Sequence, residues 1–271
     1  MTYQSRELSL AENRLYGDLA WLWPILSDPA HYCHEAAAFC DAIRGHASIP
    51  MATLLDLGCG GGHNDLHLKQ DFQITGVDLS AGMLGHARRL NPEATYVQGD
   101  LRTVRLGTAY DAVIIADAID YMQTESDLAA AFATAHAHLR PGGVFCTYAE
   151  HTREHFVQNQ NKCWTRSREE VEVTFLENHY DPDASDATFE GTFVYLIRER
   201  GRLHIETDRH LLGLFDLPTW RRLLAAAGFE IVETTLAEED EPPIPMFICK
   251  SAWPTGTSQP VEERNQHRRR V

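Results

Sequence analysis

Short apolar runs alternate with helical patterns over the first 150 residues. The apolar runs lie at about 52–57, 73–78, 96–101, 110–116 and 144–149, and the helical patterns lie at about 63–69, 81–90 and 126–139. The run Tyr110-Asp-Ala-Val-Ile-Ile-Ala116 is almost continuously apolar, which is typical of a parallel strand covered on both faces. Strands that alternate with helices are joined by right-handed crossovers in one parallel sheet. The pattern therefore predicts an α/β fold with a doubly wound, mostly parallel sheet.

The period of the pattern changes to two after about residue 160. Apolar and polar residues alternate from Val171 to Phe175, and similar alternation continues to about residue 212. Alternation of this kind, interrupted by turn-forming stretches, predicts an antiparallel β insertion after the fifth strand. The remaining predicted elements are a helix that starts at Asp216-Leu-Pro218 and ends at Gly228, and a closing hairpin formed by the runs at 229–235 and 245–250.

These patterns divide the chain into five parts. The predicted parts are an N-terminal helical lid (1–50), the parallel core (51–160), the antiparallel insertion (161–212), a C-terminal helix with closing strands (213–252) and a disordered tail (253–271). Within the lid, Asp28 is the expected N-cap of a helix over about 30–44. Trp21 and Trp23 precede that helix, and either simple packing or a lid that excludes water explains such a pair. A solvated acidic loop is expected at 238–243.

The charge balance excludes two classes of partner. The 271 residues contain 24 basic and 39 acidic side chains, which gives a net charge of −15. Nucleic acids and anionic lipid surfaces require a basic face, so we expect neither a nucleic-acid partner nor a membrane. No apolar run approaches the roughly 18 residues of a membrane-spanning helix, and the first residues lack a signal-peptide pattern. Six cysteines without regular spacing indicate reduced thiols and a cytoplasmic location.

A glycine-rich stretch follows the first predicted strand. Leu54-Leu-Asp-Leu-Gly-Cys-Gly-Gly-Gly-His63 has four glycines within five positions. Glycine permits positive φ and removes the Cβ atoms that would keep a ligand away from the backbone. A dinucleotide fingerprint would need a third glycine where His63 stands, and a P-loop would need a lysine that is absent. The spacing that remains is an acid followed by alternating glycines, Asp56-x-Gly58-x-Gly60-x-Gly62.

This spacing resembles the first motif of the class I S-adenosylmethionine (SAM) methyltransferases, which have a Rossmann-like core. The motifs that follow in the order of that family are Gly76-Val-Asp78-Leu-Ser, Gly99-Asp100, Asp111-Ala-Val-Ile-Ile and Leu139-Arg-Pro-Gly-Gly143. An acid in the first motif suits a ligand that carries an amino group and a sulfonium, and it does not suit a pyrophosphate. Residues 11–250 look like a small-molecule methyltransferase, and the implied cosubstrate is S-adenosyl-L-methionine.

Three features are similar to the sugar-amine N,N-dimethyltransferases of antibiotic pathways and, through them, to glycine N-methyltransferase. They are Tyr16-x-Asp18-Leu19, Tyr32-x-x-Glu35-Ala36 and the antiparallel insertion. The sugar-amine enzymes have Ile-Gly-His after the fourth strand, where this chain has Ile119-Asp120-Tyr121. That departure leaves the catalytic base and the acceptor open.

The resemblance implies a set of residues that bind SAM. Asp78 ends the second strand 20 residues after Gly58, where a carboxylate is placed to accept the ribose hydroxyls. An acid at this point also caps helices, although Ser80 is available for that role. The complete implied set is Tyr16, Tyr32, Asp56, Gly58, Gly60, Gly62, Asp78, Leu79, Met83, Asp100, Leu101 and Ala116.

Within that set the resemblance implies separate roles. The glycines of the first motif would line the methionine end of SAM, and Met83 would pack on the adenine. Asp100 and the Leu101 backbone would bind the adenine edge. Tyr16 and Tyr32 would reach the carboxylate or sulfonium side.

Ionisable side chains collect after the fourth and fifth strands, at the expected mouth of the site. They are Asp117, Asp120, Tyr121, Glu150, His151 and His155. We take His151 as the candidate base, Asp117 as the anchor of a cationic acceptor and Tyr121 as a third catalytic candidate. Structural roles compete with these, since Asp120 is also placed to cap the next helix and His155 to lie on the surface. No metal is expected, because no second ligand cluster accompanies His63-x-x-x-His67.

The predicted activity is transfer of a methyl group from SAM to a small-molecule acceptor. The sulfonium methyl is already activated, so the protein has to align the acceptor and exclude water. An amine nitrogen is the first choice because an acidic mouth suits a cationic amine. Methylation of a carboxyl or hydroxyl oxygen is the alternative, and a scaffold that binds SAM without catalysis is a third. The exposed insertion offers a surface for a homodimer.

Overall fold

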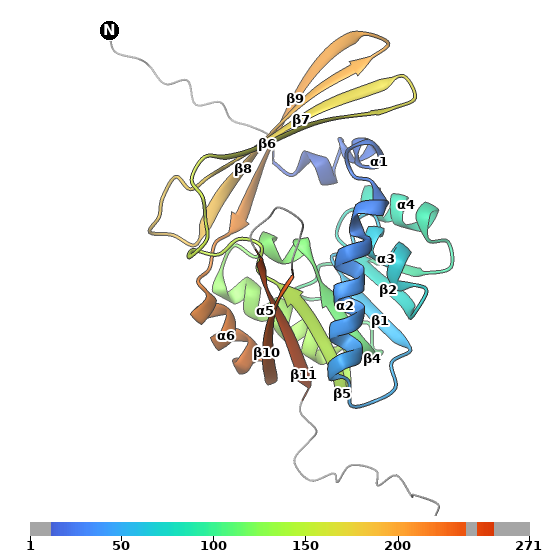
Figure 1. The fold of residues 1–271 in the computed structure, drawn as a ribbon, viewed down its shortest axis with the longest axis vertical. Helices are drawn as coiled ribbons and strands as arrows, with labels where there is room; N and C mark the ends of the chain where they lie inside the picture. Colours follow the sequence, from blue (N-terminus) through green and yellow to red (C-terminus); the bar gives the residue numbers. More distant parts are fainter. Residues whose placement is uncertain (1–11, 237–242, 252–271) are drawn as a thin grey trace, which may run out of the picture.

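Two sheets and the helices around them make up the described part of the chain, which is residues 12–236 and 243–251 of a computed structural model (Figure 1). The first part of the predicted lid, most of the predicted acidic loop and the predicted tail lie outside the described residues.

The larger sheet has seven strands in the order β10-β11-β5-β4-β1-β2-β3. The first five strands along the chain pair in parallel, while β11 runs antiparallel to both β5 and β10. The predicted doubly wound, mostly parallel sheet with a closing hairpin is confirmed. The strands are β1 (Thr53–Leu57), β2 (Gln73–Asp78), β3 (Thr95–Gln98), β4 (Tyr110–Ile115), β5 (Leu139–Tyr148), β10 (Phe229–Leu236) and β11 (Ile244–Ser251).

Helices cover both faces of this sheet because neighbouring strand residues point to opposite sides. Leu54 faces Phe39 of α2, whereas Leu55 belongs to the opposite cluster with Phe132 of α5 and Trp220 of α6. Burial of each such side chain stabilises the fold by about 1.5–3 kcal/mol. The helices are α1 (Trp23–Leu26), α2 (Cys33–His46), α3 (His63–Leu68), α4 (Ala81–Leu90), α5 (Glu125–Ala137) and α6 (Leu217–Ala226), with short 3-10 helices η1 (Arg14–Tyr16), η2 (Ala20–Leu22), η3 (Pro29–Tyr32) and η4 (Asp117–Tyr121).

The predicted insertion is a separate four-stranded antiparallel sheet in the order β6-β7-β8-β9. It stands above the end of the larger sheet where β5 leads into it, and α1 lies beneath it (Figure 1). Leu15, Leu19 and Leu22 of the N-terminal segment pack against Val173 and Tyr195 of this sheet. The strands are β6 (Gln160–Arg168), β7 (Val171–Tyr180), β8 (Thr188–Glu199) and β9 (Arg202–Gly213).

Two strand boundaries differ from the sequence prediction. The sequence predicts that a helix ends at 139 and that the fifth strand begins at 144, but β5 already begins at Leu139, which pairs with Tyr110 before an irregularity in the register. Arg140 holds this stretch by donating to the buried Asp111 carboxylate at 2.5 Å. In contrast, β3 ends at Gln98, because a turn in which Thr103 N donates to Asp100 O follows it.

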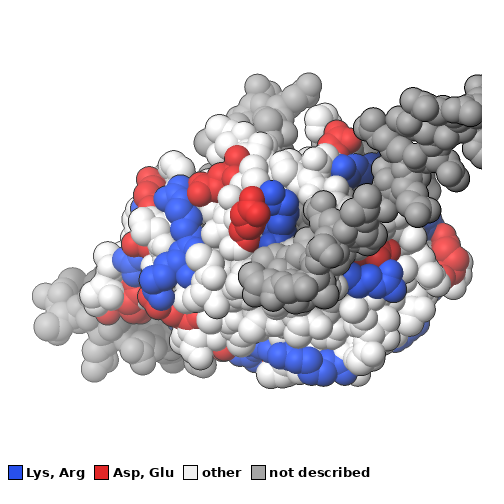
Figure 2. Space-filling view, turned by 90° about the horizontal axis from the view of Figure 1, so that it is seen from below, with Lys and Arg blue, Asp and Glu red and all other residues white. Residues whose placement is uncertain are grey.

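Charged groups of both signs are interspersed on the surface. On the face shown in Figure 2, basic and acidic side chains are interspersed. Arg222 and Glu125, for example, form an ion pair at 2.7 Å. No helix in the described segments has the length and the apolar run needed to cross a membrane. All six cysteines are free thiols.

The start of α6 allows a test of whether the N-cap residue Asp216 stabilises the helix. The Asp216 side chain accepts from Thr219 N at 2.8 Å, as the sequence predicts for an N-cap. We expect Asp216→Ala to lower the free energy of unfolding by about 1 kcal/mol, measured by urea denaturation. Asp216→Asn retains a capping oxygen and is expected to stay near the wild-type value. An equal loss in both variants would show that the cap does not stabilise α6.

Candidate active site

The glycine turn after β1 passes close to two other parts of the chain. Gly58 has φ +87°, and a Cβ there would lie 2.1 Å from the Cβ of Ala118. Gly62 has φ +75°, and a Cβ there would lie 2.8 Å from the Asn91 amide. Gly60 differs, since nothing lies within 4 Å of the position of its Cβ. Backbone conformation and packing therefore require two of the glycines, and the third opens onto space where a ligand can approach the backbone.

A buried pair of carboxyl groups, Asp56 and Asp65, lies beneath this turn. Asp56 is 2% exposed, and its burial and the charge of Asp65 raise its pKa well above the ordinary value. Tyr96 donates to Asp65 at 2.8 Å, and burial raises the Asp65 pKa to about 6. Oδ1 of Asp56 has no hydrogen-bond partner among the described residues. A buried acceptor without a donor fits a ligand with an amino group, as SAM has.

Asp78 connects the turn to the start of α4. Its carboxylate accepts from Gly60 N at 2.9 Å and from Ser80 N at 2.8 Å. The N-cap of α4 is Ser80, whose hydroxyl accepts from Met83 N at 3.1 Å. The competing helix-capping role thus belongs to Ser80. Asp78 keeps acceptor capacity at the end of β2, where the resemblance implies the ribose.

Leu79 and two of the predicted adenine contacts, Met83 and Asp100, are arranged in three different ways. Leu79 is 66% exposed and offers an apolar surface. The Met83 side chain is fully buried against Leu19 and other residues of the N-terminal segment. Its contact with the adenine stays a prediction. Asp100 is occupied by Arg102, which donates to both carboxylate oxygens.

Residues of the predicted lid cover the glycine turn. A Cβ at Gly61 would lie 2.3 Å from the indole nitrogen of Trp23, whose ring stacks on His63 at 5.5 Å. Tyr32 contacts the same imidazole edge-on at 5.0 Å, and burial raises the pKa of its phenol. Burial lowers the pKa of His63 to about 4. His67 instead bonds the Pro29 carbonyl at 2.8 Å, so the two histidines do not converge on one ligand.

A cavity of about 460 Å³ lies between the lid, the ends of β4 and β5 and the first insertion strand. Three carboxylates line it: Glu35, Asp117 and Glu150. Asp117 accepts a short hydrogen bond from Tyr148, and Glu35 accepts from Asn64 at 2.7 Å. Ala116, which precedes Asp117, is 7% exposed. The other lining residues are Leu26, Ser27, His31, Tyr32, Tyr148, Lys162, Trp164, Arg166, Leu236 and Ile244.

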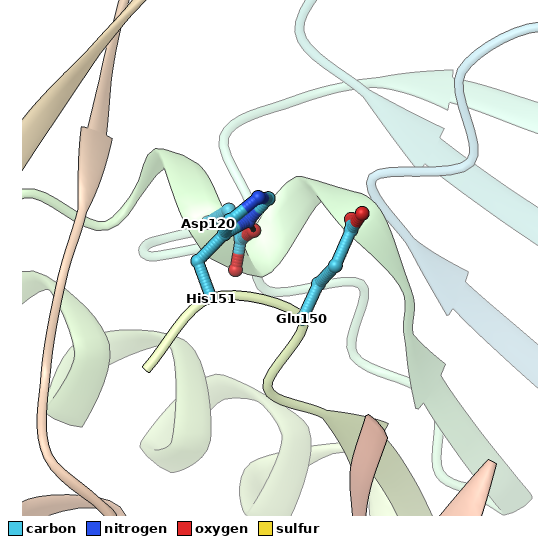
Figure 3. Close-up of side chains that lie close together, drawn as sticks. All are labelled: Asp120, Glu150 and His151. Atoms are coloured by element: carbon cyan, nitrogen blue, oxygen red, sulfur yellow. Dashed lines mark hydrogen bonds and ion pairs between the residues drawn. The ribbon is translucent and has the colours of Figure 1, made fainter. Parts of the chain in front are cut away.

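The predicted base, His151, forms a pair with Asp120 beside this cavity. Its Nδ1 lies 2.8 Å from Asp120 Oδ2, and Glu150 comes within reach of both (Figure 3). Burial lowers the pKa of His151, but the hydrogen bond and charge of Asp120 outweigh burial and raise it to about 9. His151 is therefore a cation at neutral pH. It accepts a proton only at higher pH.

The competing structural roles at the mouth are also resolved. The N-cap of α5 is Thr124, which accepts from Asp127 N at 3.0 Å, so Asp120 does not cap that helix. His155 is exposed.

Tyr121 connects to His210 and, through it, to Asp208, two residues that sequence reasoning did not select. Its hydroxyl lies 3.1 Å from that of Tyr16 and 2.5 Å from Nδ1 of His210, and His210 Nε2 lies 2.8 Å from Asp208. Asp208 and His210 are both fully buried. They occupy alternate inward positions of β9, which are apolar in an ordinary half-buried strand. Two ionisable residues at successive inward positions were the signal in the sequence.

The parallel sheet, the turn that is open at Gly60 and the acid at the end of β2 define a class I SAM-dependent methyltransferase. Residues 54–143 match the family model described as a methyltransferase domain. The chain is 31% identical over 205 residues to dTDP-3-amino-3,4,6-trideoxy-alpha-D-glucopyranose N,N-dimethyltransferase from Streptomyces venezuelae, covering 74% of this chain and 84% of the relative. The chain belongs to the SAM-dependent methyltransferase family, and SAM is its methyl donor.

Solved structures have the same fold. The crystal structure of Streptomyces venezuelae DesVI superposes with a TM-score of 0.74 at 26% identity and covers 87% of this chain and 96% of its own. SAM-bound CalS10 is an amino pentose methyltransferase from Micromonospora echinaspora. It superposes with a TM-score of 0.69 at 24% identity and covers 86% of this chain and 94% of its own. The likeness extends well beyond the 54–143 region that matches the family model.

Calorimetry with S-adenosylhomocysteine tests the role of Asp78. We expect Asp78→Ala to weaken binding at least about 10²-fold, because hydrogen bonds to a charged group are worth about 1.5–3 kcal/mol each. Glu93→Ala, which removes a surface acid paired with Lys69, serves as the control and is expected to bind normally. Unchanged affinity in Asp78→Ala would refute the ribose assignment.

An NMR titration of the histidines tests the pair of His151 and Asp120. We expect His151 to remain protonated up to about pH 9, and Asp120→Asn to return its pKa toward the ordinary range. A pKa that is raised in the folded state stabilises the fold at low pH. That stabilisation is lost as the pH rises through the folded-state value. Titration of His151 near its ordinary value in the wild type would contradict the pairing.

Proposed function

We propose that this protein methylates the amine nitrogen of an amino sugar that is carried on a nucleoside diphosphate. The observation that supports this most directly is the cavity with Glu35, Asp117 and Glu150 in its wall. Three carboxylates in a partly enclosed space create a negative potential that attracts an ammonium group. The same charges repel an acceptor carboxylate, which disfavours the alternative of carboxyl methylation.

The rim of the cavity suits the remainder of such a substrate. Lys162, Trp164 and Arg166 line it from one strand, β6. Lysine and arginine bind phosphate oxygens, and an indole ring offers a face on which a nucleobase stacks. The relative from Streptomyces venezuelae is named for a dTDP-linked amino sugar, and this rim supports the same class of acceptor here.

The predicted catalytic residues take complementary roles in this proposal. Asp117 anchors the acceptor ammonium, and the N-terminal segment 13–28 covers the turn and excludes water. His151 is an imidazolium at neutral pH and balances the charges of Asp120 and Glu150. Tyr121 lies between the mouth and β9, and its hydroxyl donates to that of Tyr16 at 3.1 Å. An amine attacks the activated methyl only in its neutral form, so one proton has to leave the acceptor.

Two further expectations belong to the same proposal. A homodimer would form through the insertion sheet, where Leu176, Leu203 and Ile205 are between 39% and 58% exposed. A cytoplasmic location agrees with six free thiols.

Mass spectrometry with isotope-labelled SAM tests the acceptor. We expect the labelled methyl group on the nitrogen of dTDP-3-amino-3,4,6-trideoxy-α-D-glucopyranose, and slower reaction with the same amino sugar without its nucleotide. Malonate and glucose serve as carboxyl and hydroxyl controls and are expected to remain unmodified. A label found only on oxygen would overturn the amine proposal. Equal rates with and without the nucleotide would remove the role given to the β6 rim.

A further inference from the structure

The three carboxylates in the cavity wall differ in their hydrogen bonds. Glu35 accepts from Asn64 at 2.7 Å, and Asp117 accepts a short hydrogen bond from Tyr148. Within the described part of the chain, no group donates a hydrogen bond to the Glu150 carboxylate, on which burial and neighbouring charges act. A donor stabilises the charged form of a carboxylate and makes it less basic. Glu150 is therefore the wall carboxylate that loses no basicity to a donor and keeps its oxygens for a ligand.

The backbone on both sides of Glu150 is fixed. Ala149 N donates to Pro245 O at 2.9 Å, and Thr152 forms a bridge with Phe215. Ala149 itself is fully buried, while the half-buried Glu150 lines the cavity. A group that takes a proton from a bound acceptor has to be held in place beside it, and these contacts hold Glu150 at the cavity wall.

Charges of both signs act on Glu150 from the surrounding elements. Burial raises its pKa above the ordinary value, and the negative charges of Asp120 from η4 and Glu177 from β7 raise it further. The positive charges of the adjoining His151 and of Lys162 from β6 act in the opposite direction and favour the carboxylate form. The most effective general base has a pKa near the working pH, so a raised pKa makes Glu150 a better base than an exposed glutamate.

The neighbouring pair of His151 and Asp120 does not take this role at neutral pH. His151 already carries a proton there, because the hydrogen bond and charge of Asp120 outweigh burial and raise its pKa to about 9. In Figure 3 the His151 ring and the Asp120 carboxylate lie against each other, and the Glu150 carboxylate stands beside them. One polar atom of each of the three residues lies within 4.8 Å of the others. The imidazolium thus favours a charged Glu150 before an acceptor binds.

The cavity also borders the donor side of the site. Ser27 and Tyr32 line it, and Ser27 Oγ lies 3.1 Å from Nδ1 of His63, which follows the glycine turn. Asp117 lines the same cavity and precedes Ala118, which lies against that turn. One acceptor nitrogen in this space can therefore meet Glu150 and the activated methyl group together.

We propose that Glu150 is the general base that removes a proton from the acceptor ammonium, while Asp117 anchors that group. This rests on the proposed function, in which the acceptor is an amine. An oxygen of Glu150 forms an O–H bond as one N–H bond of the ammonium breaks. The nitrogen keeps the electron pair of the broken bond and becomes the nucleophile. Glu150 gives its proton to water when the product leaves the cavity.

Replacement of the carboxylate by an amide tests the base. We expect Glu150→Gln to lower kcat at pH 7 by about 10²-fold, a typical contribution of acid–base catalysis. The loss is expected to vanish above the pKa of the free amine, where the acceptor arrives neutral. Glu154→Gln is the matched control, because Glu154 is exposed in the same segment and the amide can still accept from Leu217 N. This control is expected to keep the wild-type rate.

A weaker negative charge in the cavity is a competing cause of a slower variant. Glu35→Gln removes the same charge from the same wall, and Asn64 can still donate to the amide oxygen. We expect Glu35→Gln to raise the KM for the acceptor without a pH-dependent change in kcat. A pH-dependent loss of kcat equal to that of Glu150→Gln would overturn the particular role of Glu150.

Chemical rescue gives a second readout that a structural role would not produce. We expect Glu150→Ala to regain activity when formate is added, because a small carboxylate fits the space that the side chain leaves. Calorimetry with S-adenosylhomocysteine checks that the variants are folded. If Glu150→Gln and Glu150→Ala do not fold, Glu150→Asp decides, since its shorter side chain is expected to slow the reaction at pH 7 but not above the pKa of the free amine.

Three outcomes separate the base from the proposed function. Amine methylation by the wild type with an equal loss at every pH in Glu150→Gln would overturn the base and leave the function standing. Failure of formate to restore Glu150→Ala would do the same. Methylation of oxygen alone would overturn both.

Discussion

The close approach of the chain at the glycine turn constrains the rest of the active site. Gly58 leaves no room for a side chain because Ala118 lies against it, and Ala118 belongs to η4 together with Asp117, Asp120 and Tyr121. The turn that receives the donor therefore fixes the position of the segment that meets the acceptor. Trp23 packs on Gly61 in the same way and fixes the lid. An added methyl group at Gly58 would displace the donor turn and η4 together.

Buried acidic side chains are stabilised by three different means in this protein. Asp56 and Asp65 lie so close that repulsion and burial favour a protonated carboxyl. Asp120 is paired with the imidazolium of His151. This pairing raises the pKa of His151 to about 9. Asp208 is satisfied by backbone N–H groups and by His210. The last arrangement is also connected to a side-chain hydroxyl, because His210 Nδ1 lies 2.5 Å from the Tyr121 hydroxyl.

Local patterns were sufficient to predict most of the fold and the glycine turn after β1. The period of the hydrophobic pattern, the helix-capping residues and the spacing of the glycines all depend on residues close in the sequence. β1, β2, α4 and the cap at Asp216 could therefore be placed from the sequence. The stretch 139–143 could not, because its strand character comes from pairing with Tyr110 and from the contact of Arg140 with Asp111. The packing of Met83 against the N-terminal segment could not be read from the sequence for a similar reason. Segments more than 60 residues apart in the sequence determine its surroundings.

The insertion sheet adds side chains to a cavity that the core and the N-terminal segment mostly form. β6 contributes Lys162 and Arg166 to the rim of the cavity, and β9 contributes Asp208 and His210 to the buried hydrogen bonds with Tyr121. Antiparallel pairing sets His210 opposite Gly191 of β8, and Phe193 of the same strand packs on its ring. A change of one residue in that register would turn His210 to the other face of the sheet. The pairing of β8 with β9 thus fixes the position of His210 beside Tyr121.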